Sequence, residues 1–148
     1  MKDNILNITW NDILEDSRKL ANILKHNRIN FDCIVCVTRG GMIPATILAH
    51  ELNIKYIDTV CISSYQSHQQ QDIICLKPIN DATKKFSNIV VIDELVDSGN
   101  TIKYIKNQLP NAYYCSLYVK EQSKNEVDLY IKQFSQDNWL NFPWENKL

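Results

Sequence analysis

Two adjacent carboxylates and a turn of small residues are the parts of this chain whose types and spacing could do chemistry. Asp93 and Glu94 follow a buried, β-branched strand at Ile89–Ile92, where like charges cost free energy unless a cation or hydroxyl groups engage them. The turn 97–101, Asp-Ser-Gly-Asn-Thr, then leads into a helix. Such a turn presents backbone N–H groups and hydroxyls, and the helix dipole favours an anion there. The pattern favours a ligand that carries both a polyol and a phosphate, such as a ribose 5-phosphate.

A plainer interpretation of the same residues is that Asp93 ends a strand and the turn is an ordinary helix cap. Either half alone would favour this interpretation, but the two halves in direct succession favour a ligand site. The spacing excludes two other phosphate or metal motifs. A Walker A loop needs a lysine after its last glycine, and an EF-hand needs acids at alternate positions.

The composition is typical of one soluble domain. The chain has 148 residues, 45% hydrophobic and 22% charged, so we expect a single domain over residues 1–148. A net charge of −1 argues against nucleic acid as a partner. The longest apolar runs are strand-sized and none precedes Trp10, so we expect no membrane span, no secretory signal and a cytoplasmic location.

Cys33 and Cys36 form a CxxC string that could indicate a redox or metal site. They lie in a short apolar run, and residues three apart on a strand point to opposite faces, so the two thiols should not meet. No second CxxC or histidine pair completes a zinc site. We therefore interpret both residues as buried structural cysteines.

Strands and helices alternate along the chain, which predicts an α/β fold with a mostly parallel twisted sheet flanked by helices. The expected helices are Thr9–Asn27, a segment from Pro44 to Leu52, and one that begins near Thr101; the expected strands are 33–38, 56–63, 89–92, 112–119 and 127–134, with a mobile loop at 64–72 and an irregular tail from Ser135. The loops 39–41 and 93–101 both follow strands and precede helices. Both should therefore lie on the rim where such sheets bind ligands.

The segment 89–101 resembles the phosphoribosyl pyrophosphate (PRPP) signature of the type I phosphoribosyltransferases. The wider chain is similar to the xanthine-guanine branch of that family, and the matching segments are 8–10, 38–41, 58–65, 136–137, Trp139 and 143–144. The resemblance implies a hood made of the terminal segments and a flexible loop. It also implies a purine salvage enzyme that uses PRPP, guanine or xanthine (hypoxanthine more weakly) and Mg²⁺. A homotetramer and peripheral membrane association are compatible with it.

The resemblance also assigns the site residues. The PRPP site would comprise Arg39, Gly40, Asp93, Glu94, Leu95, Val96, Asp97, Ser98, Gly99, Asn100 and Thr101. Glu94 would bind the metal, and Asp97 would be the general acid/base beside N7 of the purine. For the base, Lys120 would donate to O6, Trp139 would stack, and Leu140 would offer its backbone carbonyl. The loop 66–72 would close over the site.

Alternatives stay open for two of the base residues. Lys120 could be a solvated lysine at a strand end, and Trp139 could be a core tryptophan, although Trp10 and Trp144 suit that role better. Three positions differ from the family pattern: Glu94 replaces an aspartate, Gln71 replaces an arginine, and Asn100 replaces a glycine. A PRPP-sensing regulator and a pyrimidine or hypoxanthine enzyme of the same fold are the competing functions.

Overall fold

The computed structural model describes residues 4–67 and 70–145, apart from the side chains of 65–71. Six strands form one sheet in the order β4-β3-β2-β5-β6-β7, parallel except for the antiparallel pair β3 and β4. Their bounds are β2 Cys33–Val37, β3 Tyr56–Ser67, β4 Gln70–Lys77, β5 Ile89–Val96, β6 Tyr113–Lys120 and β7 Leu129–Phe134. The predicted mostly parallel sheet is confirmed.

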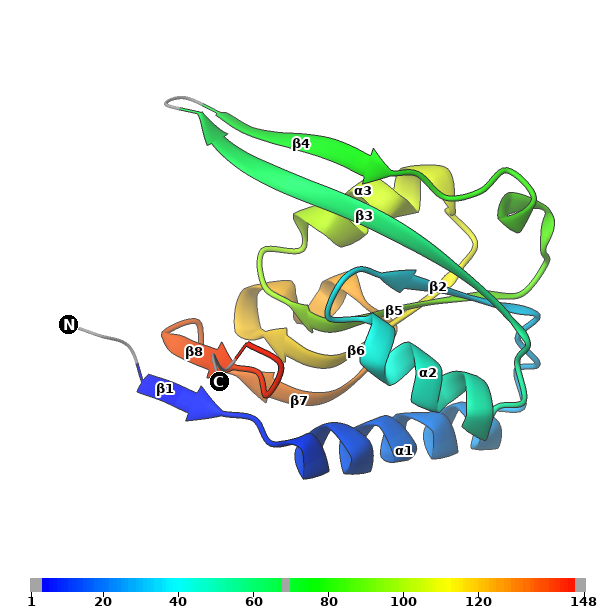
Figure 1. Cartoon of the computed structure of the whole chain (residues 1–148), viewed down its shortest axis with the longest axis horizontal. Coiled ribbons are helices and arrows are strands. Elements are labelled where there is room, and N and C mark those ends of the chain that lie inside the picture. Colours follow the sequence, from blue (N-terminus) through cyan, green and yellow to red (C-terminus); the bar gives the residue numbers. More distant parts are fainter. Residues whose placement is uncertain (1–3, 68–69, 146–148) are drawn as a thin grey trace.

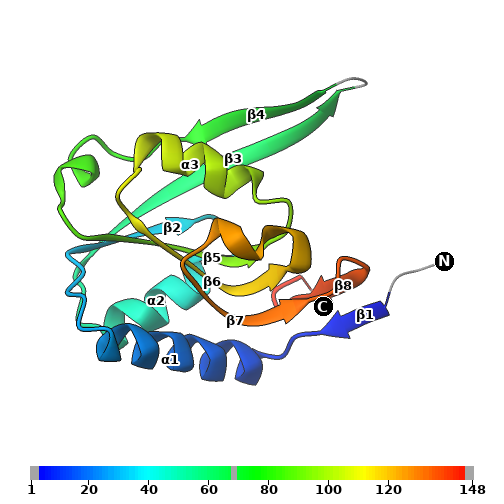
Figure 2. The ribbon, with the colours of Figure 1, turned by 180° about the vertical axis from the view of Figure 1, so that it is seen from behind.

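Helices cover both faces of the sheet (Figure 1). The helices α1 (Trp10–His26) and α2 (Met42–Glu51) pack on one face, and α3 (Asn100–Gln108) packs on the other. The view from behind shows the same layers (Figure 2). Two short 3-10 helices, η1 (Thr83–Lys85) and η2 (Glu121–Glu126), complete the connections.

Local sequence signals set the ends of the helices. The hydroxyl of Thr9 accepts from the backbone N–H of Asp12 at 3.0 Å, and the Asp12 carboxylate accepts from the Thr9 N–H at 2.8 Å. This capping box satisfies two N–H groups at the start of α1, as the sequence predicted. Pro44 lies in the first turn of α2, where its missing N–H has no cost.

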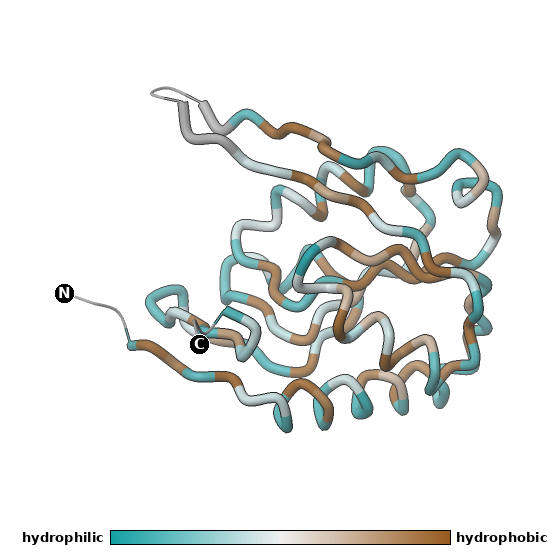
Figure 3. The backbone as a smooth tube through the Cα atoms, in the orientation of Figure 1, coloured by the Kyte–Doolittle hydropathy of each residue, from teal (hydrophilic) through white to brown (hydrophobic). Residues whose placement is uncertain are grey.

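The core consists of two apolar layers, one on each face of the sheet. The hydropathy colouring shows the central strands as the most hydrophobic part of the backbone (Figure 3). The side chains of β2 alternate between the layers, so Cys33 packs on the α3 side and Cys36 on the α1 side. Burial raises the thiol pKa of Cys33 to about 12 and that of Cys36 to about 11. Both cysteines are free and buried, which confirms the structural interpretation.

The two ends of the described chain form a second, two-stranded sheet. The strand β1 (Asn4–Asn7) pairs in parallel with β8 (Asn138–Asn141), and Ile5 lies opposite Trp139. The hood made of terminal segments is therefore present. The prediction of an irregular tail was wrong for β8, because this short strand is specified by a partner at the far end of the sequence.

The β3–β4 hairpin corrects a second expectation. Residues 64–67 and 70–72 were predicted as a loop because they are polar and show no periodicity, but they continue the two strands, with residue 66 opposite 71. Antiparallel pairing uses backbone groups, so it does not require apolar alternation. The hairpin and the β1–β8 pair both extend on the side where β2 and β5 end (Figure 1). The predicted closure of the loop and the Gln71 side chain lie outside the described part.

Candidate active site

The loop after β2 meets the acidic end of β5. A Cβ atom placed on Gly40 would lie 2.1 Å from Cδ of Glu94, so a side chain at position 40 would displace the carboxylate from its place against the loop. A Cβ on Gly41 would lie 2.5 Å from the carbonyl oxygen of Val37, which explains the second glycine. The peptide bond between Thr38 and Arg39 is cis. The two loops that the sequence placed on one rim are thus in contact.

The strand β5 is longer than predicted and contains both acids of the pair. It runs to Val96, so Asp93 and Glu94 lie inside the strand rather than beyond its end. Asp93 is 7% exposed, and its Oδ1 accepts a hydrogen bond from the backbone N–H of Glu94 at 2.9 Å. Burial, and then the neighbouring charge of Glu94, raise the pKa of Asp93 well above its ordinary value.

The turn between β5 and α3 depends on Gly99. This glycine has φ 83°, and a Cβ there would lie 2.7 Å from Cγ of Glu126. The hydroxyl of Ser98 accepts from the backbone N–H of Asn100 at 3.3 Å. Asn100 is the first residue of α3, and its φ is not positive, so the helix accommodates a side chain where the family often has glycine. Thr101 follows it in the first helical turn, half-buried.

The 3-10 helix η2 supports this turn from behind. The buried hydroxyl of Ser123 donates to the carbonyl of Val96 at 2.6 Å. Glu126 lies beside Gly99 and forms ion pairs with Lys103 at 3.5 Å and Lys106 at 3.7 Å on α3. These contacts join η2 to both ends of the turn and hold its backbone in place.

Asp97 is exposed at the start of the turn, and its Oδ1 accepts from Nε2 of Gln136 at 3.0 Å. The two residues before it contribute differently. Leu95 is half-buried against one apolar layer and Val96 is buried in the other, so we expect both to meet a ligand mainly through their backbone groups.

Lys120 is buried at the end of β6, with 4% of its surface exposed. Its ammonium donates to the carbonyl oxygens of Ser135 at 3.2 Å and Gln136 at 3.4 Å, and also to that of Asn138. The alternative of a solvated lysine at a strand end is therefore wrong. The side chain reaches the turn between β7 and β8, next to the strand that carries Trp139.

The tryptophans are arranged differently from the expectation. Trp139 is 62% exposed, which excludes the core alternative, but Trp10 is 56% exposed and is not a core residue either. Trp144 is half-buried, and its ring stacks on Phe142 with centroids 4.9 Å apart. Leu140 is buried, and it fixes β8 against the apolar core.

One cavity of about 870 Å³ brings several of the predicted residues together. Arg39 and Gly40 line it from the loop, Glu94 from β5, and Trp139 from β8. Sequence reasoning did not assign the other lining residues, which are Met42, Ile43, Asn141, Trp144 and Glu145. The only signal for Trp144 was its membership of a matching segment. A loop, an acid and an exposed aromatic ring thus face one space large enough for a nucleotide-sized ligand.

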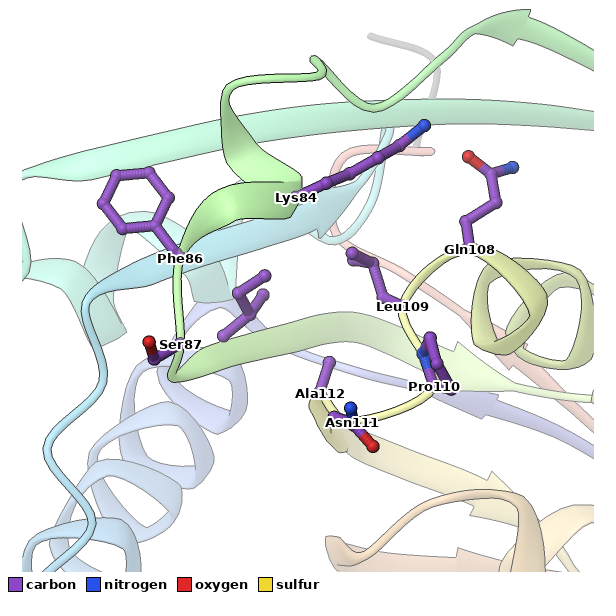
Figure 4. Close-up of a pocket in the computed structure, with 9 residues that line it drawn as sticks. Lys84, Phe86, Ser87, Gln108, Leu109, Pro110, Asn111 and Ala112 are labelled. Atoms are coloured by element: carbon purple, nitrogen blue, oxygen red, sulfur yellow. The ribbon is translucent and has the colours of Figure 1, made fainter.

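A second hollow lies at the opposite end of the sheet (Figure 4). It has a volume of about 340 Å³ and lies where β5 and β6 begin, with Lys84, Phe86 and Asn111 in its wall. Its lining contains no carboxylate. Ligands of parallel sheets bind at the carboxyl ends of the strands, which favours the larger cavity as the functional one.

The comparisons with known proteins agree with this geometry. Residues 8–147 match the family described as the phosphoribosyl transferase domain. The chain is 36% identical over 138 residues to xanthine-guanine phosphoribosyltransferase of Chromohalobacter salexigens, covering 93% of this chain and 82% of that protein. Purine phosphoribosyltransferase of Pyrococcus horikoshii superposes with a TM-score of 0.84 at 24% identity, covering 97% and 96% of the two chains. Xanthine-guanine-hypoxanthine phosphoribosyltransferase of Helicobacter pylori superposes with a TM-score of 0.77 at 27% identity, covering 96% and 94%.

The chain therefore belongs to the phosphoribosyltransferase family, and the type I fold inferred from the sequence is confirmed. Within that family, the Chromohalobacter relative is a xanthine-guanine enzyme, which is the branch that the sequence resembled. In residues 4–67 and 70–145, no helix is long and apolar enough to cross a membrane.

Proposed function

We propose that this protein is a purine salvage enzyme that transfers the 5-phosphoribosyl group of PRPP to N9 of guanine or xanthine, and more weakly of hypoxanthine. The products would be the nucleoside 5′-monophosphate and pyrophosphate. The observation that carries the proposal is the cavity shared by the Arg39–Gly40 loop, Glu94 and Trp139. The Arg39–Gly40 loop offers a cation and backbone amides to the pyrophosphate. Glu94 offers a carboxylate to the metal, and Trp139 offers an aromatic ring to the base.

The phosphate end of the substrate would be held by the turn 97–101. Its backbone N–H groups, the Ser98 hydroxyl and the start of α3 form an anion site in which charge and hydrogen bonding act together. Arg39 would bind the pyrophosphate on the other side of the ribose. Asp93, buried beside Glu94, would receive the ribose hydroxyls. Hydrogen bonds from those hydroxyls would add donors to a buried carboxylate that already contacts the backbone N–H groups of Glu94 and Leu95 and the Glu94 side chain.

The purine would stack on Trp139, whose exposed ring is available for it. Lys120 would donate to O6 of the base, which favours a 6-oxopurine over adenine. The carbonyl of Leu140 would accept from a 2-amino group. In the transfer step, the bond between C1′ and the pyrophosphate oxygen breaks as N9 bonds to C1′, and the electron pair leaves with pyrophosphate. Asp97 would take the proton from N7, and Arg39 would stabilise the developing charge.

The residues also fit the Mg²⁺ that the family implies. Magnesium in proteins keeps several waters and is held by one or two carboxylates together with substrate phosphates, so it does not require a cage of protein ligands. Glu94 lines the same cavity as Arg39, so a carboxylate lies beside the position proposed for the pyrophosphate, while no cluster of three or more His, Cys, Asp or Glu side chains occurs in the part of the chain that the structure describes. Glu94 would hold the metal, with Asp93 beside it. When bound, Mg²⁺ supplies positive charge that neutralises the pyrophosphate.

The experiment that tests the proposal is nucleotide formation from PRPP, Mg²⁺ and each base in turn. Guanine and xanthine should give product at higher kcat/KM than hypoxanthine, and adenine and the pyrimidine bases should give none. No product from any purine, together with tight PRPP binding by calorimetry, would instead support the regulatory alternative. Light scattering would test the homotetramer that the resemblance implies.

A further inference from the structure

The turn between β7 and β8, residues 135–138, contacts two residues that the proposed function places on either side of the purine. Within this turn, Nε2 of the Gln136 side chain donates a hydrogen bond to Oδ1 of Asp97 at 3.0 Å. The two residues are 39 positions apart in the sequence. Its backbone carbonyls accept from the ammonium of Lys120. The turn therefore connects the group expected to take the N7 proton with the group expected to donate to O6.

Gln136 contacts the carboxylate of Asp97, which is the group proposed to take the proton. A carboxylate has two oxygens, and the amide holds one of them, which leaves Oδ2 to be presented to a ligand. A second glutamine, Gln122, also reaches Asp97, but its Nε2 donates to the backbone carbonyl at 3.3 Å and fixes the chain rather than the carboxylate. In the described part of the chain, the Gln136 amide is thus the group that restricts rotation of the Asp97 carboxylate.

Lys120 fixes the position of Gln136. An ammonium has three N–H groups, and the carbonyls of Ser135, Gln136 and Asn138 match all three. A purine O6 that accepts from Lys120 must displace one of these carbonyls. The arrival of the base is therefore linked to the turn that carries Gln136.

We propose that Gln136 is a positioning residue, which aims the Asp97 carboxylate at the base, and that Lys120 sets its place through the turn. This inference rests on the proposed function. It differs from a purely structural role because Gln136 is an exposed side chain on an exposed partner, so its loss should leave the fold unchanged.

The test compares Gln136→Met with Gln133→Met, a matched change on β7, where the Gln133 side chain accepts a hydrogen bond from the Tyr130 hydroxyl at 3.5 Å. Steady-state rates would be measured with guanine and PRPP, together with Tm. For Gln136→Met we expect kcat to fall about tenfold, as for loss of a hydrogen bond to a charged group, with KM for PRPP and Tm unchanged. Gln133→Met should match the wild type in all three quantities.

A second variant separates the loss of the hydrogen-bond donor from a change in the shape of the side chain. Gln136→Glu keeps the length of the side chain but replaces the donor by a carboxylate that repels Asp97, so kcat should fall at least as far as in Gln136→Met. In a Lys120→Met background, Gln136→Met should lower kcat by less than tenfold, because the turn is no longer held.

The outcomes are distinguishable. If the wild type forms no nucleotide, the proposed function fails and the role of Gln136 falls with it. If the wild type is active but Gln136→Met keeps its kcat, or Gln136→Glu matches the wild type, only the positioning role is wrong. A lower Tm in Gln136→Met, or full additivity with Lys120→Met, would also overturn it.

Discussion

Asp58 and Asp93 are two buried aspartates of the same sheet, 8% and 7% exposed, and their surroundings differ completely. Asp58, near the start of β3, receives four hydrogen bonds from described residues: from the Lys77 ammonium, the Thr83 hydroxyl and the N–H groups of Thr59 and Asn80. Asp93, in the second half of β5, receives the backbone N–H groups of Glu94 and Leu95 and shares a side-chain hydrogen bond with Glu94, which is itself an acid.

The pKa values of the two residues move in opposite directions. Burial acts to raise the pKa of Asp58, but its hydrogen bonds outweigh burial and hold that pKa below its ordinary value. Burial and Glu94 raise the pKa of Asp93. We therefore expect Asp58, whose donors come with the fold, to be structural, and Asp93, which is buried beside a second acid, to meet a ligand. On this expectation, the amino end of the sheet contributes stability and the carboxyl end contributes binding.

The largest expected effect is a loss of turnover from a change at the carboxyl end of the sheet. Asp97→Asn should lower kcat by about 10²–10⁴-fold, because an amide cannot take the proton from N7. Asp97 is exposed, so Tm should stay within the range of a neutral surface change. Rates of nucleotide formation and thermal melting check both statements. Equal losses of turnover and substrate binding would contradict the base role.

On the structural side, Asp58→Asn should destabilise the protein by about 1–3 kcal/mol, since a charged acceptor with several donors is lost. A lowered folded pKa gives stability that is fully present above the unfolded value, near 4, and is lost as pH falls through the folded value. The stability difference between wild type and variant should therefore be largest at neutral pH and shrink below pH 4. Urea unfolding as a function of pH measures it, and kcat should change little.

Asp93→Asn should have the opposite effect on stability to Asp58→Asn. It should stabilise the protein at neutral pH while weakening PRPP binding. A raised folded pKa gives stability that is present below the unfolded value and lost as pH rises through the folded value. The advantage of the variant should therefore grow as pH rises from about 4. Melting in EDTA, with PRPP titration by calorimetry, measures the two effects. A destabilised variant at pH 7 would show that Asp93 is structural after all.

The smallest effect is expected in the hollow at the amino end. Asn111→Ala should change stability by no more than about 0.5 kcal/mol and leave kcat/KM for both substrates unaltered. Kinetics and melting of this variant, measured beside the three others, serve as the reference for an uninvolved polar residue. A loss of activity here would mean that the wrong end of the sheet has been assigned.

The sequence predicted what depends on local pattern. The apolar run at Cys33, the capping box at Thr9 and the acid pair at Asp93 are each specified by residues within a few positions, and the structure contains them. Because the turn 97–101 combines glycine with hydroxyls, its position before a helix could also be predicted.

The features that escaped prediction depend on distant partners. The strand β8 becomes a strand only because β1 lies beside it, and Lys120 is buried only because the turn after β7 folds over it. Trp10 is the first residue of α1 and is exposed, and its ring lies beside that of Trp144, a contact between the two ends of the sequence that no local periodicity specifies. The Gln136–Asp97 bond likewise needs a fold that brings two loops together.

The pairing of β1 with β8 has a consequence for biosynthesis. Asn7 and Asn141, which share a hydrogen bond at 2.9 Å, are 134 positions apart, so β1 leaves the ribosome long before its partner exists. Contacts of such separation form late in folding. The nascent polypeptide therefore carries an unpaired first strand throughout translation, and we expect the surface for the nucleobase to be the last part of the molecule to mature.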